Sequence, residues 1–376
     1  MSSKWPAKYV IGLTGNISTG KSVVRKMLEH LGAYGIDADG LSHRATSKGA
    51  PGYQATIDVF GKWIVGPDGE IDRSKLGKLV FNDPEAMARL ENIIHPLVLQ
   101  AIDVMVKRAS QRVIVIEAIK LLETELHSAC DTIWVVNVPE DMQVKRIVEK
   151  RHLSPDEATQ RIKFQPPQQT KLSAAHTIIQ NVGTFEDTWK QVVAEWKKIV
   201  PQSDTFQAVK PTQGDFLVAR GRPRDSASIA ELVTRLSGGR RKLTSDDVMA
   251  AFGEKAFMLL QQNGKNVGVA GWQVENLVAR TTEFFIDQSV PAEDALKILI
   301  AEVERTSADL QCEASLLFLP AELTVHQTTW KQLGYEPRTP QSLGLQAWTD
   351  AAIDSAQPNT DLYFKQLRQD RVLRPI

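Results

Sequence analysis

The stretch that most constrains this chain is Gly15-Asn16-Ile17-Ser18-Thr19-Gly20-Lys21-Ser22, which has the spacing glycine, four residues, glycine-lysine-serine. A short apolar run from Tyr9 to Thr14 precedes it and predicts a buried strand. Apolar residues at helical spacing follow it, and Gly32 gives a stop signal. A strand, a glycine-rich loop and a helix in this order form a phosphate-binding loop, because loop N–H groups and the helix N-terminus both attract anions. The sequence therefore predicts a nucleotide-binding α/β domain.

The phosphate-binding pattern predicts which residues contact the phosphates of ATP and which hold the metal ion. We expect the loop from Gly15 to Ser22 to bind ATP, with Lys21 reaching the β- and γ-phosphates and the Ser22 hydroxyl holding Mg²⁺. The apolar run at residues 113–117 ends in Glu117, where P-loop enzymes place a second acidic group near Mg²⁺. Any buried strand that happens to end in glutamate would look the same, so both interpretations of Glu117 stay open.

Two carboxylates, Asp37 and Asp39, follow the second predicted strand at residues 33–36. Carboxylates at the C-terminal edge of a parallel strand face the crevice where ligands bind. A kinase needs a carboxylate to orient the attacking hydroxyl or to accept its proton, and we favour this role for Asp39. Asp37 fits equally well as the N-cap of the next helix.

Two helical regions interrupt the predicted sheet. Residues 52–108 form an insertion of the kind in which a nucleotide kinase holds its acceptor, and His95 within it is either a packed histidine or a ligand contact. A basic helical stretch farther on contains Arg146, Lys150 and Arg151. It predicts a lid that brings cations over the phosphates, although a solvated face would have the same pattern. Charge alone does not decide which cation reaches the phosphates.

The bulk properties set limits on class and partners. With 376 residues the chain exceeds one ordinary core, so two domains are expected. Lys plus Arg and Asp plus Glu both number 45, which disfavours nucleic acid and anionic membrane as partners. No apolar run is long enough to span a bilayer. Two widely separated cysteines are typical of a reducing compartment, and we expect a cytoplasmic protein whose oligomeric state stays open.

A stretch rich in proline and polar residues divides the chain. It predicts a nucleotide-binding domain at 1–200, a linker at 201–214 and a second domain at 215–376. In the second domain we expect a strand at 216–220, a helix at 226–236 and a further strand at 283–287. Because the linker is polar, we expect the first domain to fold and to work without the second.

Further motifs follow the loop in a fixed order: Asp37-Ala38-Asp39, Asp72-Arg73, His95-Pro96, Glu123, Arg146 and Asn181-Val182-Gly183. Together with the loop they resemble the dephospho-CoA kinase family. The resemblance implies a P-loop kinase fold, a parallel sheet with a helical substrate domain and a lid. It also implies transfer of the γ-phosphoryl group of ATP to the ribose 3′-hydroxyl of dephospho-CoA.

The same resemblance distributes the site residues. Lys21 and Asp39 would be catalytic, and Asn181 would lie near the adenine of ATP. The acceptor dephospho-CoA would be bound by Asp37, Arg73, His95 and Glu123.

This sequence also departs from the family pattern. Ile119-Lys120-Leu121 replaces proline-leucine-leucine, and Lys150 aligns with the usual lid arginine. Lysine is a point donor and cannot clamp a phosphate with two parallel bonds. The alternative function is therefore a nucleotide-binding regulatory or interaction protein with an impaired kinase half.

The second half resembles acetyltransferases of the GNAT type in its order of elements and in the stretch from Trp330 to Glu336. The glycine-containing pyrophosphate loop of that family is replaced by residues 288–292, and Pro291 removes a backbone donor. We expect an α+β acetyltransferase-like domain without a competent acetyl-CoA site. Weak binding of CoA or an acyl-CoA in an apolar groove stays open.

Overall fold

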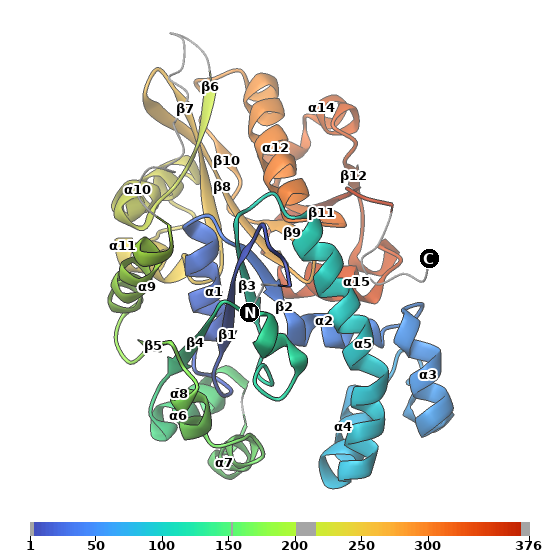
Figure 1. The fold of residues 1–376 in the computed structure, drawn as a ribbon. Helices are drawn as coiled ribbons and strands as arrows, with labels where there is room; N and C mark the ends of the chain where they lie inside the picture. Colours follow the sequence, from blue (N-terminus) through green and yellow to red (C-terminus); the bar gives the residue numbers. More distant parts are fainter. Residues whose placement is uncertain (1–3, 152, 201–215, 370–376) are drawn as a thin grey trace.

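The computed structural model describes residues 4–151, 153–200 and 216–369, with the backbone alone at Phe81, Lys150 and Arg151 (Figure 1). Within these ranges no helix is both long enough and apolar enough to cross a membrane. The linker predicted at residues 201–214 lies outside the described residues.

The first domain is built on a five-stranded parallel sheet. Its strands run in the spatial order β2 (Tyr34–Asp37), β3 (Val113–Glu117), β1 (Tyr9–Thr14), β4 (Thr132–Asn137) and β5 (Thr177–Gln180). β1 pairs with both β3 and β4, so the segment that follows β1 leaves the middle of the sheet at its carboxyl edge. Ligands bind at this edge in open α/β sheets.

Helices cover both faces of this sheet. On one face α1 (Lys21–His30) and α9 (Phe185–Ile199) bury Val24, Met27 and Val192 against the inner strands. On the other face α2 (Ala38–Ala45) and α5 (Pro84–Arg108) bury Leu41 and Ile102. Strands buried on both faces explain why the sequence shows continuous apolar runs here rather than alternation.

Two helical parts extend beyond the sheet. The insertion consists of α3 (Pro51–Phe60), η1 (Lys62–Ile64), α4 (Arg73–Asn82) and α5, with a small core of its own. The basic stretch forms α6 (Glu140–Arg151), α7 (Pro155–Lys163) and α8 (Gln168–Ser173). Ile147, Ala158 and Ile162 of this stretch pack on Ile17 of the glycine-rich loop. A short helix, η2 (Glu125–Ala129), precedes β4.

The second domain has a larger, mixed sheet. The strands run in the order β12 (Glu336–Pro337), β13 (Thr360–Gln366), β11 (Ala314–Pro320), β9 (Val278–Thr281), β8 (Lys265–Glu275), β7 (Ala256–Gln262) and β6 (Phe216–Arg220), with β10 (Phe285–Ile286) beside β8. Only the β9–β11 pair among these described strands is parallel. The helices are α10 (Ser226–Leu236), α11 (Ser245–Ala251), α12 (Ala292–Asp309), α13 (Ala321–Thr324), α14 (Gln327–Gln332) and α15 (Gln346–Asp354), with η4 (Pro223–Asp225) and η5 (Pro340–Ser342) between them.

The expected fold class is confirmed, a parallel-sheet nucleotide-binding domain followed by a second domain of mixed sheet and helices. The strand expected at 283–287 is wrong in extent, because only residues 285–286 pair with β8. Before it, the side chain of the buried Glu283 binds Lys255 with both carboxylate oxygens, while its backbone carbonyl accepts from the N–H of Gly271 on β8. The strands at 278–281 and 360–366 were not predicted.

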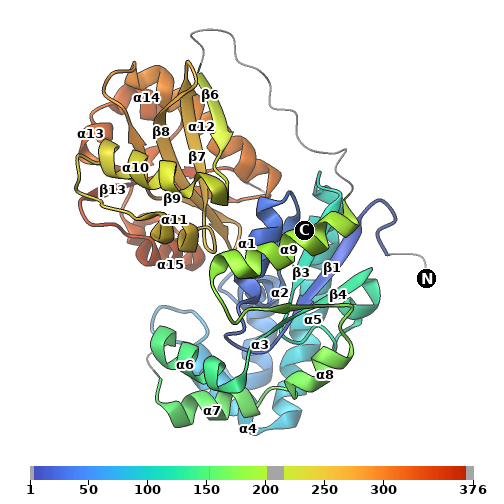
Figure 2. The ribbon, with the colours of Figure 1, turned by 90° about the vertical axis from the view of Figure 1, so that its left-hand side faces the viewer.

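A hairpin joins the two domains. Leu277, at the turn between β8 and β9, is buried in the same core cluster as α2 and α5 of the first domain. Lys26 donates to the carbonyl of Val274 at 2.8 Å, and Gln311 donates to the carbonyl of Met105 at 2.8 Å. Figures 1 and 2 show the second domain resting beside α1 and α2. An apolar anchor and buried polar bonds therefore connect the two domains, and the independence of the first domain stays a prediction.

One ion pair tests this interface directly. Arg44 binds Glu313 at 2.7 Å across the domains, with side chains 12% and 2% exposed. Because Arg44→Met leaves a buried carboxylate without its arginine, we expect a loss of about 3 kcal/mol in the free energy of unfolding. Urea denaturation measures it.

The matched control is Arg305→Met, which removes the ion pairs with Glu302 and Asp309 of an arginine that is 59% exposed. It should change the free energy by less than about 1 kcal/mol. Equal, small effects of the two substitutions would show that the domains do not depend on each other.

Candidate active site

The loop between β1 and α1 has the backbone of a phosphate-binding loop. Gly15 and Gly20 have φ values of 149° and 93°, which side chains rarely adopt. A Cβ at Gly20 would lie 2.1 Å from Nδ2 of Asn181. Ser18 takes a left-handed φ of 59° although it is not glycine. Such a residue stores about 1–3 kcal/mol of strain, which the surrounding contacts must offset.

Asn181 and Arg146 hold this strained loop. The Asn181 side chain donates to the carbonyl of Thr19 at 2.9 Å and accepts from Thr188. Arg146 donates to the carbonyls of Asn181 at 2.8 Å and Ser18 at 3.4 Å. Both residues therefore contact the loop backbone. The side chains of Lys150 and Arg151, the other two predicted lid cations, lie outside the described residues.

Two glutamines that sequence reasoning missed also bind the loop. Gln168 accepts from the N–H of Asn16 at 3.0 Å, and Gln165 accepts from the N–H of Ile17 at 2.8 Å. The start of the loop is thus tied to α8 and the segment before it. The later loop and the first turn of α1, whose N–H groups have no partners within the helix, form the anion cradle.

The metal-binding pair expected from the sequence is brought together. The register of β1, β2 and β3 sets Leu13 and Asp37 level with Glu117 at the carboxyl edge. The Ser22 hydroxyl donates to Glu117 Oε1 at 2.8 Å, and Lys21 beside it is buried, with its ammonium 3.3 Å from the Asn16 carbonyl. No three His, Cys, Asp or Glu side chains gather as a metal site in the part of the chain that the structure describes. Mg²⁺ usually takes only one or two carboxylates and completes its shell with phosphates and water, so Ser22 and Glu117 fit it.

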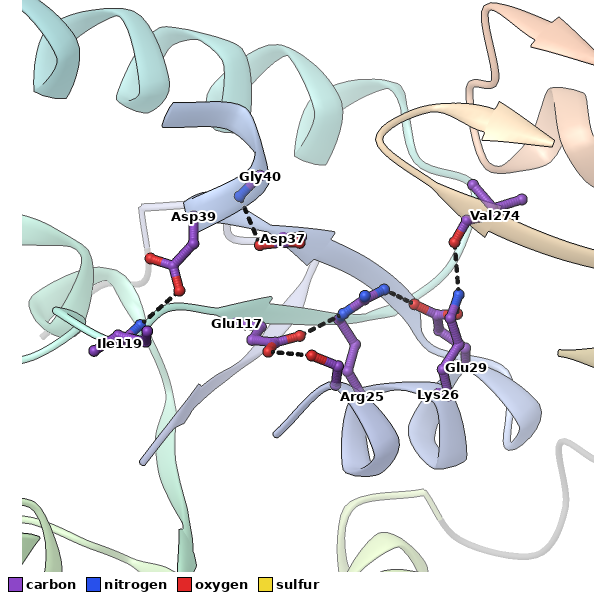
Figure 3. A network of polar contacts seen from close by, with 10 residues as sticks. Arg25, Lys26, Glu29, Asp37, Asp39, Gly40, Glu117, Ile119 and Val274 are labelled. Atoms are coloured by element: carbon purple, nitrogen blue, oxygen red, sulfur yellow. Dashed lines mark hydrogen bonds and ion pairs between the residues drawn. The ribbon is translucent and has the colours of Figure 1, made fainter. Parts of the chain in front are cut away.

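A chain of buried charges extends from Glu117 (Figure 3). Arg25 donates to Glu117 Oε2 at 2.7 Å and to Glu29 at 2.6 Å, and Lys26 binds the other oxygen of Glu29 at 2.9 Å. Burial alone would raise the pKa of Glu29, but Lys26 and Arg25 lower it to about 2. Glu29 is therefore ionised throughout the neutral range.

The two aspartates have different surroundings. Asp37 accepts from the N–H of Gly40 at 2.8 Å and is the N-cap of α2. Asp39 lies in the first turn of the same helix, and its Oδ2 accepts from the N–H of Ile119 at 3.1 Å (Figure 3). Burial raises the pKa of Asp39 to about 6, although Lys21 acts to lower it. A carboxylate of this pKa beside the loop lysine is suited to accept a proton near neutrality.

Lys171 is a buried cation that the sequence did not indicate. It is 1% exposed, and its ammonium donates to the carbonyl of Ile119 at 2.6 Å. Burial lowers its pKa to about 8, and Glu123, Lys21 and Asp39 are the charges that act on it. A single lysine in a polar stretch is usually solvated, so only the folded structure reveals its place.

The residues expected to bind the acceptor substrate lie in two different places, Arg73 at a cavity and Glu123 and His95 on the side of Lys171 and α5. Arg73, at the start of α4, donates to the carbonyl of His43 at 3.4 Å and lines a cavity of about 310 Å³. Glu123 is exposed near Lys171, and His95 lies half-buried on α5. His95 lies one turn beyond Glu91, which binds Lys120 at 2.5 Å. This face of α5 is therefore turned towards the segment after β3, in which the N–H of Ile119 binds Asp39.

Comparison with known proteins identifies the first half. A family model described as dephospho-CoA kinase matches residues 9–187. A dephospho-CoA kinase from Carboxydothermus hydrogenoformans is 42% identical over 194 residues, which cover 50% of this chain and 94% of the relative. The chain belongs to the dephospho-CoA kinase family.

Solved structures similar to each half exist as well. A dephospho-CoA kinase from Campylobacter jejuni is 27% identical with a TM-score of 0.38, covering 51% of this chain and 97% of its own. A PaiA N-acetyltransferase from Thermoplasma acidophilum in complex with coenzyme A is 8% identical with a TM-score of 0.31, covering 40% and 99%.

The pKa of Asp39 leads to a pH prediction. Below about pH 6 the protonated carboxyl cannot accept the hydroxyl proton, so kcat/KM should fall about tenfold per pH unit. Steady-state rates between about pH 5 and 8 measure this limb, which reports the free enzyme.

Asp37→Asn is the matched control, because asparagine also serves as an N-cap and the acidic limb should remain. An acidic limb that persists unchanged in Asp39→Asn would assign it to another group.

Proposed function

We propose that this chain transfers the γ-phosphoryl group of ATP to the ribose 3′-hydroxyl of dephospho-CoA, giving coenzyme A and ADP. One observation supports the proposal most strongly, namely that three groups of residues suited to phosphoryl transfer lie together at the carboxyl edge of the parallel sheet. These are the loop with Lys21, the hydroxyl–carboxylate pair of Ser22 and Glu117, and the half-buried Asp39. Family membership supplies the substrate.

In this mechanism Asp39 accepts the proton of the attacking hydroxyl. The loop N–H groups and Lys21 hold the phosphates of ATP and stabilise the charge on the group in transfer. When bound, Mg²⁺ would neutralise charge on the phosphates, with Ser22 and Glu117 as its protein ligands. Asn181 and Arg146 keep the strained loop in shape, so their contribution to ATP binding is made through the loop backbone.

The rival function, a regulatory protein with an impaired kinase half, rests partly on Ile119-Lys120-Leu121. Ile119 contributes only its backbone to the site, its N–H to Asp39 and its carbonyl to Lys171. The proline of the family pattern has no N–H, so this departure adds a donor to Asp39 rather than removing a contact, and it gives no ground for an impaired kinase.

We also infer that the reaction takes place in the cytoplasm. Cys130 and Cys312 are both free thiols, which fits a reducing compartment. The Asp37 side chain, which we propose as an acceptor contact, also accepts from the N–H of Gly40 and so holds the start of α2.

The test is an ADP-release assay with ATP, Mg²⁺ and three acceptors. We expect turnover with dephospho-CoA, and background rates with coenzyme A, whose 3′-hydroxyl is already phosphorylated. Adenosine is the third acceptor, and a faster rate with it than with dephospho-CoA would refute the substrate assignment.

Lys21→Ala should lower kcat by about a hundredfold or more, because a preorganised cation at the transferring group is lost. Lys198→Ala, at a lysine of α9 that is 68% exposed, is the control and should leave kcat unchanged. Near-normal turnover of Lys21→Ala would remove Lys21 from the catalytic machinery.

Lys171→Met should lower kcat about tenfold while KM for ATP stays the same, since Lys171 positions Asp39 through the backbone of Ile119. Lys171→Arg should recover part of the loss if a cation at this point is what matters. An effect of Lys171→Met on KM for ATP alone would place Lys171 at the nucleotide instead.

A further inference from the structure

A cavity of about 310 Å³ lies between the two domains, apart from the glycine-rich loop. Its walls on the side of the first domain come from α2 and the segment that leads into α4. Its walls on the other side come from the β8–β9 hairpin, from Arg280 on β9 and from α15. The second domain therefore provides about half of the enclosure.

The cavity lies on α2, the helix that carries the proposed catalytic carboxylate, although Asp39 itself is not among its lining residues. Gly40, which directly follows Asp39, lines it, and His43 lines it one turn farther along α2. A Cβ at Gly40 would lie 2.5 Å from Oδ1 of Asn276, so the hairpin packs directly on this turn. A ligand whose hydroxyl lies at Asp39 would therefore reach the cavity with a part several bonds away from that hydroxyl.

The charges of the lining point to the kind of ligand. Three arginines and four carboxylates line the cavity, namely Arg44, Arg73 and Arg280, with Glu70, Glu275, Asp350 and Asp354. A nearly balanced set of charges gives no strong field for a polyanion such as a diphosphate. It offers instead donors and acceptors side by side, which suits a neutral chain of amides and hydroxyls.

Part of this hydrogen-bonding capacity is not used within the protein. Arg280 is 5% exposed and binds Ser355 at 3.0 Å and Glu275, yet its Nε has no hydrogen-bond partner among the described residues. On the facing helix, Gln346 and Asp350 are exposed and bonded to each other at 2.7 Å. Exposed groups of this kind exchange partners at little cost when a ligand arrives.

We propose that this cavity holds the pantetheine arm of dephospho-CoA, so that the second domain forms part of the acceptor site. This inference rests on the proposed function. The arm carries two amides, a hydroxyl and a thiol and no charge, as the lining requires. Small-molecule sites usually measure about 300–1,000 Å³, so the cavity is large enough for one arm of this acceptor rather than for all of it.

The proposal gives the second domain a role in specificity. The relative from Carboxydothermus hydrogenoformans is covered over 94% of its length by an alignment that takes only half of this chain. The wall made by β9 and α15 is therefore an addition to the kinase body that the relative shares. It would favour acceptors with the full arm over short adenine nucleotides.

The test places a large side chain in the cavity, at a position that belongs to the second domain. Ala347 lines the cavity on α15, and Ala347→Trp should raise KM for dephospho-CoA about tenfold with a much smaller change in kcat. The preference for dephospho-CoA over adenosine 5′-monophosphate, which lacks the arm, should shrink by a similar factor. Ile353→Trp is the matched control on the same helix, at a side chain 54% exposed and away from the cavity lining, and should behave as the unmodified protein.

A second variant covers the case in which Ala347→Trp does not fold. Asp350→Ala removes an exposed acceptor of the lining and should raise KM for dephospho-CoA about threefold. Unchanged KM in folded Ala347→Trp, or in Asp350→Ala where Ala347→Trp fails to fold, would overturn the proposal and leave the kinase function standing. Failure of the unmodified protein to phosphorylate dephospho-CoA would instead refute the proposed function itself.

Discussion

The buried carboxylate of Glu117 is the interaction on which the rest of the structure depends. It is 4% exposed, and its two oxygens accept from the Ser22 hydroxyl and the Arg25 guanidinium. A charge in this position needs partners, because burial without them is strongly unfavourable. Glu117 therefore fixes α1 against β3, and with α1 it fixes the start of the anion cradle.

The same charges link the nucleotide site to the second domain. Arg25 binds Glu29, Glu29 binds Lys26, and Lys26 donates to the Val274 carbonyl on β8 (Figure 3). A few residues along the same hairpin, Leu277 enters the core of the first domain. The hairpin that closes one end of this network also forms a wall of the cavity on α2. The phosphate-binding loop, the proposed acceptor cavity and the domain interface thus share one set of contacts.

The sequence predicted those parts of the fold that are determined by residues close together in the chain. The strand before the glycine-rich loop, the loop and the helix after it are defined by residues close together in sequence, and so is Asp39, two residues after the end of β2. Lys171, Gln165 and Gln168 acquire their roles only from partners far along the chain, at Ile119, Ile17 and Asn16. No periodicity marks such residues. The interface was missed for the same reason, since Leu277 in a short polar hairpin gives no sign of the core that it enters.

The central claim, that both domains hold the acceptor, is tested most directly by hydrogen exchange of the intact protein with and without dephospho-CoA. The account predicts slower amide exchange both in α2 and in residues 274–280 and 346–354 of the second domain when dephospho-CoA is bound. Coenzyme A, which has the same arm, should protect the same segments. Protection confined to the first domain would contradict the account.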